Sequence, residues 1–141
     1  MANTMNASVV WYEKDKINFK ATGGGGQEVI IDPEQKIGIK PMEMVLLGLG
    51  GCASYDVVGI LQKTRQDIVD VMCKLSATRA DSVPAVFTDI HLHFVVTGRD
   101  IKEAQVKKAI ELSAEKYCSA SRMLADGGVN ITHDYEIVAL A

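Results

Sequence analysis

The sequence predicts an α+β protein built around one long buried helix, and three observations carry this prediction. The segment from Pro41 to Leu61 is almost wholly apolar and has the pattern of one helix. The segments "DIVDVMCKLSATRA" and "AVFTDIHLHFVVTG" alternate apolar and polar residues, which is the period of a strand. Ile101 to Leu124 returns to helical spacing. With no internal repeat and the length of one domain, residues 1–141 are predicted to form a single domain.

The N-terminal segment "ASVVWYEKDKINFKATGGGGQEVIID" is predicted to form short antiparallel strands. Turns are expected at Lys14–Lys16 and at Gly23–Gly26. A glycine-rich phosphate loop must lead into a helix, whereas these glycines lead into another strand pattern. The four glycines are therefore predicted to form a hairpin or a flexible loop.

The central helix is expected to begin at Pro41 and to be packed on all sides, because it is apolar nearly all round. Its glycines each cost roughly 1 kcal/mol relative to alanine, so another backbone is expected to approach them closely, such as a second copy of the helix. These glycines are Gly48, Gly50, Gly51 and Gly59. The most apolar part, Met44 to Tyr55, is shorter than the roughly 20 residues of a bilayer span, so no membrane contact is predicted.

The remaining elements are two long strands, a helix and a terminal strand. The first strand should place one face toward the core, and the second should do the same. The expected inward residues are Val69, Val71, Cys73, Leu75 and Ala77, then Ile90, Leu92, Phe94 and Val96. "DSVPAV" is predicted to be the hairpin loop between them. Asp100 is expected to cap the second helix with Glu103 as its reciprocal partner, and "VNITHDYEIVA" to be the last strand.

Composition narrows the function classes. A net charge of −3 without a cluster of Lys and Arg argues against nucleic-acid binding. The N-terminus lacks the pattern of a signal peptide, and three cysteines without that pattern fit a reducing cytoplasm. His91 and His93 share a strand face without a third ligand at a suitable spacing, so they are predicted to be a polar face and no metal is expected. His133 is predicted to be structural.

The cysteines are the candidates for chemistry. Cys73 lies on the apolar face of a strand and is predicted to be a packing residue. Cys52 shares a helix face with Tyr55 and Asp56, and a carboxylate on so apolar a helix needs a partner or a role. A buried core thiol is the alternative at Cys52, and the spacings alone do not show that it meets Cys118.

A positive charge beside a cysteine would lower the pKa of its thiol. Arg122 lies four residues after Cys118 and is the candidate there. Glu43 lies nine residues before Cys52, about half a turn out of phase on an ideal helix, so the helix itself would keep the two apart.

At this point the sequence resembles a known family. "KPMEMVLLGLGGCASYDVVGIL", followed by "ELSAEKYCSASRML", is similar to the OsmC/Ohr family of osmotically inducible and organic hydroperoxide resistance proteins, and most to its small YhfA-like branch. The resemblance covers essentially the whole chain. It implies an OsmC-like fold with antiparallel sheets wrapped around the central helix. It also implies an intertwined homodimer whose sites lie at the subunit interface.

The resemblance further implies a thiol peroxidase that acts in the oxidative stress response. Cys52 would be the peroxidatic thiol that attacks an organic hydroperoxide, and Cys118 the resolving thiol that forms a disulfide with it. An external dithiol, small or protein-bound lipoyl, would reduce the pair, so no resident cofactor is expected.

The sequence departs from the peroxidase pattern at two positions. The family has glutamate directly after proline, whereas Met42 stands there and the acid is displaced to Glu43. The family also has an arginine near its N-terminal strands, whereas the first arginine is Arg65. The catalytic set that the resemblance implies is Cys52, Cys118 and Glu43. Two groups of residues are candidates for the missing cation: Arg79 or Arg122 of a partner subunit, and the lysines of the N-terminal third, Lys14, Lys16, Lys20, Lys36 and Lys40.

Two alternatives remain open. One is a non-catalytic protein that binds a small apolar ligand at the dimer interface and keeps its cysteines as buried or sensing thiols. The lining expected for it comprises Met42, Met44, Leu47, Tyr55 and Tyr117. The other is a purely structural or metal-binding role.

Overall fold

The computed structural model describes residues 3–141 and has the α+β architecture that the sequence predicts. Its chain contacts group into two compact units, Met1–Leu46 and Leu47–Ala141. Helix α1 (Pro41–Lys63) begins in the first unit and continues through the second. A single domain over 1–141 stays a prediction.

The first unit contains a three-stranded antiparallel sheet. Its strands are β1 (Ser8–Trp11), β2 (Phe19–Thr22) and β3 (Glu28–Ile31), in that order across the sheet. The glycine run forms the hairpin turn between β2 and β3, where the Gly23 backbone N–H donates to the Gln27 carbonyl at 2.9 Å. Gly26 has φ +88°, a conformation that favours glycine. The prediction of a hairpin is confirmed.

A buried carboxylate organises the loop that follows β3. The Asp32 side chain accepts hydrogen bonds from the backbone N–H groups of Glu34, Lys36 and Ile37 at 2.9–3.0 Å. These bonds, led by that of Ile37, lower the pKa of Asp32 and so favour its charged form. The loop is therefore ordered where it leads into α1.

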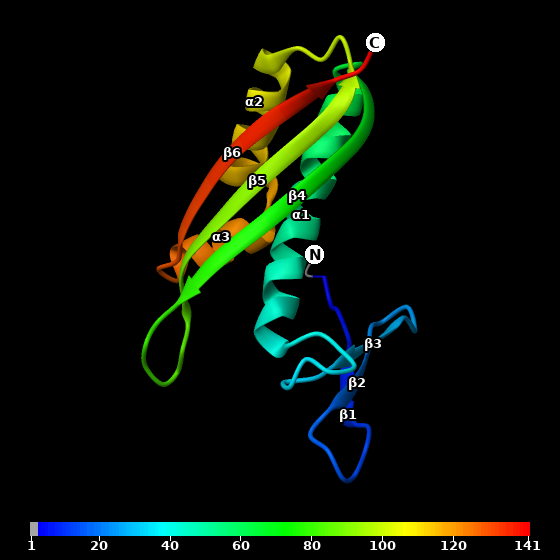
Figure 1. The fold of residues 1–141 in the computed structure, drawn as a ribbon, viewed down its shortest axis with the longest axis vertical. Helices are drawn as coiled ribbons and strands as arrows, with labels where there is room; N and C mark the ends of the chain where they lie inside the picture. Colours follow the sequence, from blue (N-terminus) through cyan, green and yellow to red (C-terminus); the bar gives the residue numbers. More distant parts are fainter. Residues whose placement is uncertain (1–2) are drawn as a thin grey trace. The chain divides into compact units, whose positions relative to one another are not determined.

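The second unit contains a mixed sheet with its helices on one face (Figure 1). Strand β4 (Asp67–Arg79) pairs antiparallel with β5 (Phe87–Arg99). Strand β6 (Asn130–Ala139) pairs parallel with β5, so the prediction of purely antiparallel sheets is wrong here. Helices cross over between β5 and β6 and return the chain to the starting edge, which makes the two strands parallel.

The alternation predicted for the two long strands is confirmed for β5 and partly for β4. On β5 every second residue is buried, namely Ile90, Leu92, Phe94 and Val96. On β4 the register shifts between Ile68 and Asp70, and Val69 is exposed instead of turned inward. Ala77 is also exposed, whereas Val71, Cys73 and Leu75 are partly buried as predicted.

Helix α1 is buried along one stripe only. Its fully buried side chains recur every four residues, and they are Leu49, Ala53, Val57 and Leu61. Gly50 lies against β4, where an added Cβ would come within 2.7 Å of a Leu75 methyl. The expectation of packing on all sides is not met within this chain, because Leu47 is 51% and Tyr55 82% exposed.

By length and composition alone, α1 could also pass as a membrane-spanning helix. Core helices of soluble proteins have the same properties, so this likeness is weak support for a membrane span.

The second predicted helix is interrupted, so its prediction as one continuous helix is wrong. It consists of α2 (Glu103–Leu112), the π-helical turn η1 (Ser113–Tyr117) and α3 (Ser119–Asp126). Asp100 does not cap α2; Lys102 occupies the N-cap position, and its N–H donates to the Gln66 side chain at 2.9 Å. Glu103 instead accepts a hydrogen bond from the Tyr135 hydroxyl at 2.9 Å.

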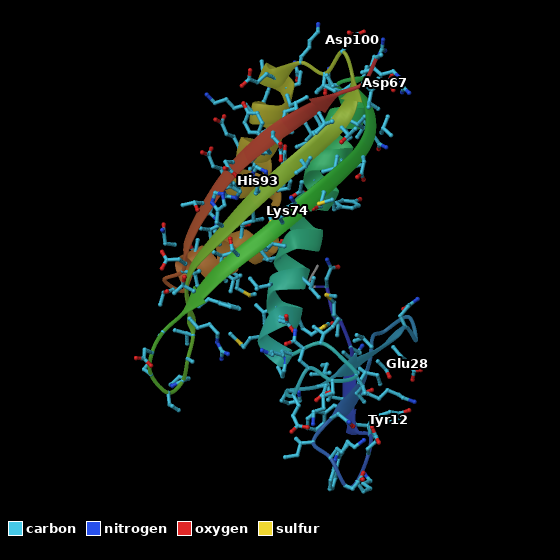
Figure 2. The ribbon with its side chains drawn as sticks, viewed as in Figure 1. Tyr12, Glu28, Asp67, Lys74, His93 and Asp100 are labelled. Carbon is cyan, nitrogen blue, oxygen red and sulfur yellow. The ribbon has the colours of Figure 1, made fainter. Side chains whose placement is uncertain are left out.

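The sheet face away from the helices carries a hydrogen-bonded ladder of histidines and carboxylates. His91 and His93 both contact Asp134 Oδ1, at 2.8 and 2.6 Å, and His93 Nε2 lies 3.0 Å from Glu136 Oε1. Both ring nitrogens of His93 face carboxylate oxygens, an arrangement that favours the imidazolium form, in which both nitrogens donate. His93 lies opposite Lys74 on β4 (Figure 2), and the prediction of a polar face is confirmed.

Replacing His93 is expected to change the pH dependence of stability. Hydrogen bonds to Glu136 and Asp134 raise the pKa of His93 above 6.5. Protonated His93 therefore stabilises the fold fully below about pH 6.5, and this contribution disappears as the pH rises through the raised pKa. We expect His93→Gln to lower the free energy of unfolding at pH 5.5 by more than at pH 8.5, measured by urea denaturation.

His133→Gln is the matched control, with the opposite trend. Burial, and then the charge of His91, lowers the pKa of His133, so its protonation opposes folding. Relative to wild type, His133→Gln should therefore change the free energy of unfolding more favourably at pH 5.5 than at pH 8.5. Equal effects of His93→Gln at the two pH values would contradict the charged ladder.

Candidate functional site

Cys52 and Cys118 come together although they are far apart in the sequence. Cys52 lies in the middle of α1 and is partly exposed, whereas Cys118 is only 2% exposed. The Cys52 side chain lies near enough to the Cys118 thiol to affect its pKa. Burial raises the pKa of Cys118, and the neighbouring Cys52 raises it further, whereas the backbone N–H and the nearby hydroxyl of Ser121 lower it. The Cys118 thiol is thus protonated at neutral pH.

The break in the helical crossover determines where Cys118 lies. The η1 turn ends where the Cys118 N–H donates to the Ser113 carbonyl at 2.8 Å. Cys118 then leaves the helical conformation, with φ −78° and ψ 104°, and becomes the N-cap residue of α3. Its sulfur accepts a hydrogen bond from the Ser121 N–H at 3.4 Å. The thiol therefore faces the N-terminal amide groups of a helix, where negative charge is stabilised.

The carboxylate of Asp56 has a partner on the same crossover. The Ser113 hydroxyl donates to Asp56 Oδ2 at 3.0 Å and lies 3.4 Å from the Ala53 carbonyl. Because Asp56 is one turn after Cys52 and Ser113 is five residues before Cys118, this bond fixes α1 against η1 beside the two thiols. Sequence reasoning missed Ser113, and its only signal was its presence in the second cysteine motif.

The predicted cations make other contacts within this chain. Arg122 donates to the Glu115 carbonyl at 3.1 Å, at an exposed position. Arg79 donates through Nε to the Ala85 carbonyl at 2.8 Å. Neither contact supports a role beside Cys118 in the same chain, and their role as cations from a partner subunit stays a prediction.

Glu43 caps the start of α1. Its carboxylate accepts a hydrogen bond from the Lys40 N–H at 3.0 Å, and the Gln35 side-chain amide donates to it at 3.3 Å. A glutamate at the third helical position commonly makes this contact with the N-cap residue. A catalytic role for Glu43 stays a prediction.

Cys73 is not part of the cysteine pair, and its environment makes its thiol unreactive. Burial raises the pKa of Cys73 to about 11, and a hydrogen bond with Ser54 opposes this rise only in part. A thiol with this pKa is almost fully protonated at neutral pH and is a poor nucleophile. This agrees with its prediction as a packing residue.

Two further features bear on function. Among residues 3–141, no group of three His, Cys, Asp or Glu side chains is arranged to hold a metal ion. A pocket of about 670 Å³ lies along α1 and brings Tyr55 and Tyr117 together. Its full lining is Ser54, Tyr55, Asp56, Val58, Gly59, Ile60, Gln62, Lys63, Leu112 and Tyr117.

Comparisons with known proteins place these features in a family. The family profile described as OsmC-like protein matches residues 33–134. Protein YhfA of Escherichia coli strain K12 is 50% identical over 138 residues, which cover 96% of this chain and 99% of that protein. A hypothetical protein from Aquifex aeolicus has a solved structure with a TM-score of 0.87 and 26% identity, covering 99% of this chain and 100% of that one.

A more distant solved structure carries a functional name. It is the organic hydroperoxide resistance protein OhrB of Bacillus subtilis, with a TM-score of 0.62 and 14% identity, covering 95% of this chain and 98% of that one. At this identity the likeness concerns the fold alone. The profile match and the identity to YhfA, taken with the α+β fold, show that the chain belongs to the OsmC-like protein family.

Proposed function

We propose that this protein is a thiol-dependent redox protein that reduces organic hydroperoxides through Cys52 and Cys118. The observation that carries the proposal is the proximity of these two thiols, which come from separate elements. Neighbouring thiols can be joined in a disulfide, whose sulfur atoms are about 2.05 Å apart.

The reaction has three steps. The Cys52 thiolate attacks one peroxide oxygen, the O–O bond breaks, and an alcohol leaves with the second oxygen and a proton. Cys52 is then a sulfenic acid. The Cys118 sulfur attacks the Cys52 sulfur and displaces water, which forms the disulfide. An external dithiol, small or lipoyl, returns two electrons and two protons by exchange and leaves as its own disulfide.

The environments of the two thiols support this order of events. Cys52 is partly exposed, whereas Cys118 is almost fully buried and has a raised pKa. A protonated, buried thiol is a poor first nucleophile toward peroxide but is well placed to react with a sulfenic acid formed beside it. OhrB is named for organic hydroperoxide resistance, and the same substrate class and stress role are proposed for this chain. We also propose a cytoplasmic location, where such dithiol reductants and reduced cysteines are maintained.

A homodimer is part of the proposal. The exposed side of α1 is largely apolar, and a Cβ added at Gly48, Gly51 or Gly59 would meet nothing within 4 Å. Three glycines in an open helix would only cost stability, roughly 1 kcal/mol each. They become useful if a second copy of α1 lies against them, because small residues permit two backbones to approach closely.

Peroxide turnover should depend on both cysteines. Wild type is expected to consume cumene hydroperoxide with dithiothreitol or dihydrolipoamide, and Cys52→Ser is expected to abolish it. Cys118→Ser should stall as a sulfenic acid or a mixed disulfide, because no thiol is left to resolve Cys52. Peroxide loss and intact mass at each time point are the measurements, and oxidised wild type should weigh about two hydrogens less.

Cys73→Ala is the matched control, since it removes a cysteine without touching the pair. It should retain turnover and the same loss of mass. Absence of turnover in wild type, with all three thiols still reduced after peroxide, would overturn the redox proposal.

Enlarging Gly51 tests the proposed dimer. In a chain that exposes Gly51 to water, a larger residue would raise helix stability by up to about 1 kcal/mol. At a close contact between two helices, Gly51→Leu would instead cost about 1–3 kcal/mol through overpacking. We expect a lower Tm and dissociation in sedimentation velocity.

Ala125→Leu, a similar increase in size on exposed α3, is the control and should leave the oligomer unchanged. A monomeric wild type, or a more stable Gly51→Leu protein, would rule out the packing of α1 against α1.

The pocket along α1 favours a second candidate, which is binding of a small apolar ligand. Of the expected lining it contains Tyr55 and Tyr117, whereas Met42, Met44 and Leu47 are not part of it. The prediction is that native mass spectrometry of the purified protein detects a bound small molecule, and that Ile60→Asp in the pocket wall removes it. Ligand-free wild type would count against this candidate.

A further inference from the structure

One buried hydroxyl group beside the cysteine pair has no hydrogen-bond partner. Ser121 is only 3% exposed, and among the side chains of residues 3–141 its Oγ alone is a buried polar atom without a partner. Burying an unpaired hydroxyl typically costs about 1–3 kcal/mol. Such a group is retained most readily where another state of the protein uses it.

The position of Ser121 identifies that state. Its backbone N–H donates to Cys118 Sγ at 3.4 Å, at the N-terminus of the eight-residue helix α3. Its hydroxyl lies close enough to the same sulfur to favour the thiolate form of Cys118. A neutral thiol is a weak acceptor, whereas a thiolate is a strong one. Ser121 thus places a bonded N–H and an unpaired hydroxyl beside Cys118, and the hydroxyl can donate to that sulfur when it carries negative charge.

In the proposed cycle, Cys118 acquires negative charge when the disulfide is broken. A reductant thiolate can attack either sulfur, and the other must leave as a thiolate. Cys118 is nearly inaccessible and has the N–H and the hydroxyl of Ser121 beside it, whereas Cys52 is partly exposed. Access to Cys52 and stabilisation of Cys118 as the leaving group therefore both favour attack of the reductant on Cys52.

We propose that Ser121 stabilises Cys118 as the leaving thiolate, so that external dithiols reduce the disulfide by attacking Cys52. The reductant sulfur forms a bond to Cys52 Sγ, the S–S bond breaks, and its electron pair passes to Cys118 Sγ. Cys118 then takes up a proton. The second reductant sulfur attacks the first, which releases Cys52 and closes the reductant's own disulfide. This proposal rests on the redox function of the pair.

The test begins with a disulfide made without peroxide. Wild type oxidised with diamide is treated with glutathione, a monothiol that cannot complete the second step, then quenched with acid and alkylated. Peptide mass spectrometry should find glutathione on Cys52 and the alkyl group on Cys118. Glutathione mainly on Cys118 would overturn the direction of attack, whether or not the protein reduces peroxides.

Variants of Ser121 separate this role from a structural one. Ser121→Ala should slow single-turnover reduction by dihydrolipoamide roughly tenfold, the scale of one hydrogen bond to a charged acceptor. Ser121→Thr, which keeps the hydroxyl, should restore most of the rate. Ser119→Ala, at an exposed position on the same helix, should leave it unchanged.

The Tm of the reduced proteins distinguishes this role from a structural one, because Ser121→Ala should lower the rate of reduction without lowering the Tm. Ser121→Ala removes a buried polar atom without a partner, so its Tm should equal or exceed that of wild type. A lower Tm with an unchanged rate of reduction would make Ser121 a structural residue and overturn the proposal. If diamide produces no disulfide between Cys52 and Cys118, the redox function fails together with it. If the disulfide forms with diamide but not with peroxide, only the proposed peroxidase activity is overturned.

Discussion

The burial of α1 along one narrow stripe is the constraint on which the rest of the second unit depends. The stripe residues include Leu49, Ala53 and Val57, and full burial of an aliphatic side chain contributes about 1.5–3 kcal/mol. Cys52 and Asp56 each directly precede a stripe residue, so both lie along the same edge of it. That edge meets the helical crossover. The opposite edge meets β4, where Gly50 permits close approach.

The crossover accommodates opposing demands on Cys118. Burial favours a neutral thiol, which protects it from reagents in solution, while the start of α3 favours its anion. The π-helical turn η1 allows Cys118 to be buried and to begin α3 at the same time. It ends the preceding helix and is followed by Cys118 in an extended conformation. A continuous helix would have used the amide groups of Ser121 and its neighbours for internal hydrogen bonds and left none for the sulfur.

Local patterns in the sequence were sufficient to predict most helices and strands, but not the breaks within them or the contacts between them. Alternation along β5 predicted its buried face because each side chain depends only on the pleat. The break before Cys118 left no such mark, since η1 contains ordinary helix-forming residues. The parallel pairing of β6 and the bond between Ser113 and Asp56 depend on how distant segments meet, and no local spacing encodes that. The cysteine motifs singled out both thiols, but only the fold brought them together.

The distance in sequence between the paired cysteines has a thermodynamic consequence. The chain between them contains β4, β5, α2 and η1, which make up most of the second unit. A covalent bond would close a loop of about 65 residues and reduce the entropy of the unfolded chain, which corresponds to about 4 kcal/mol of added stability. This is a large share of the 5–15 kcal/mol typical of a folded domain. The oxidation state of the two cysteines would therefore determine how long the second unit resists proteolysis. The rate at which the protein is degraded in the cell would then depend on whether the disulfide had formed.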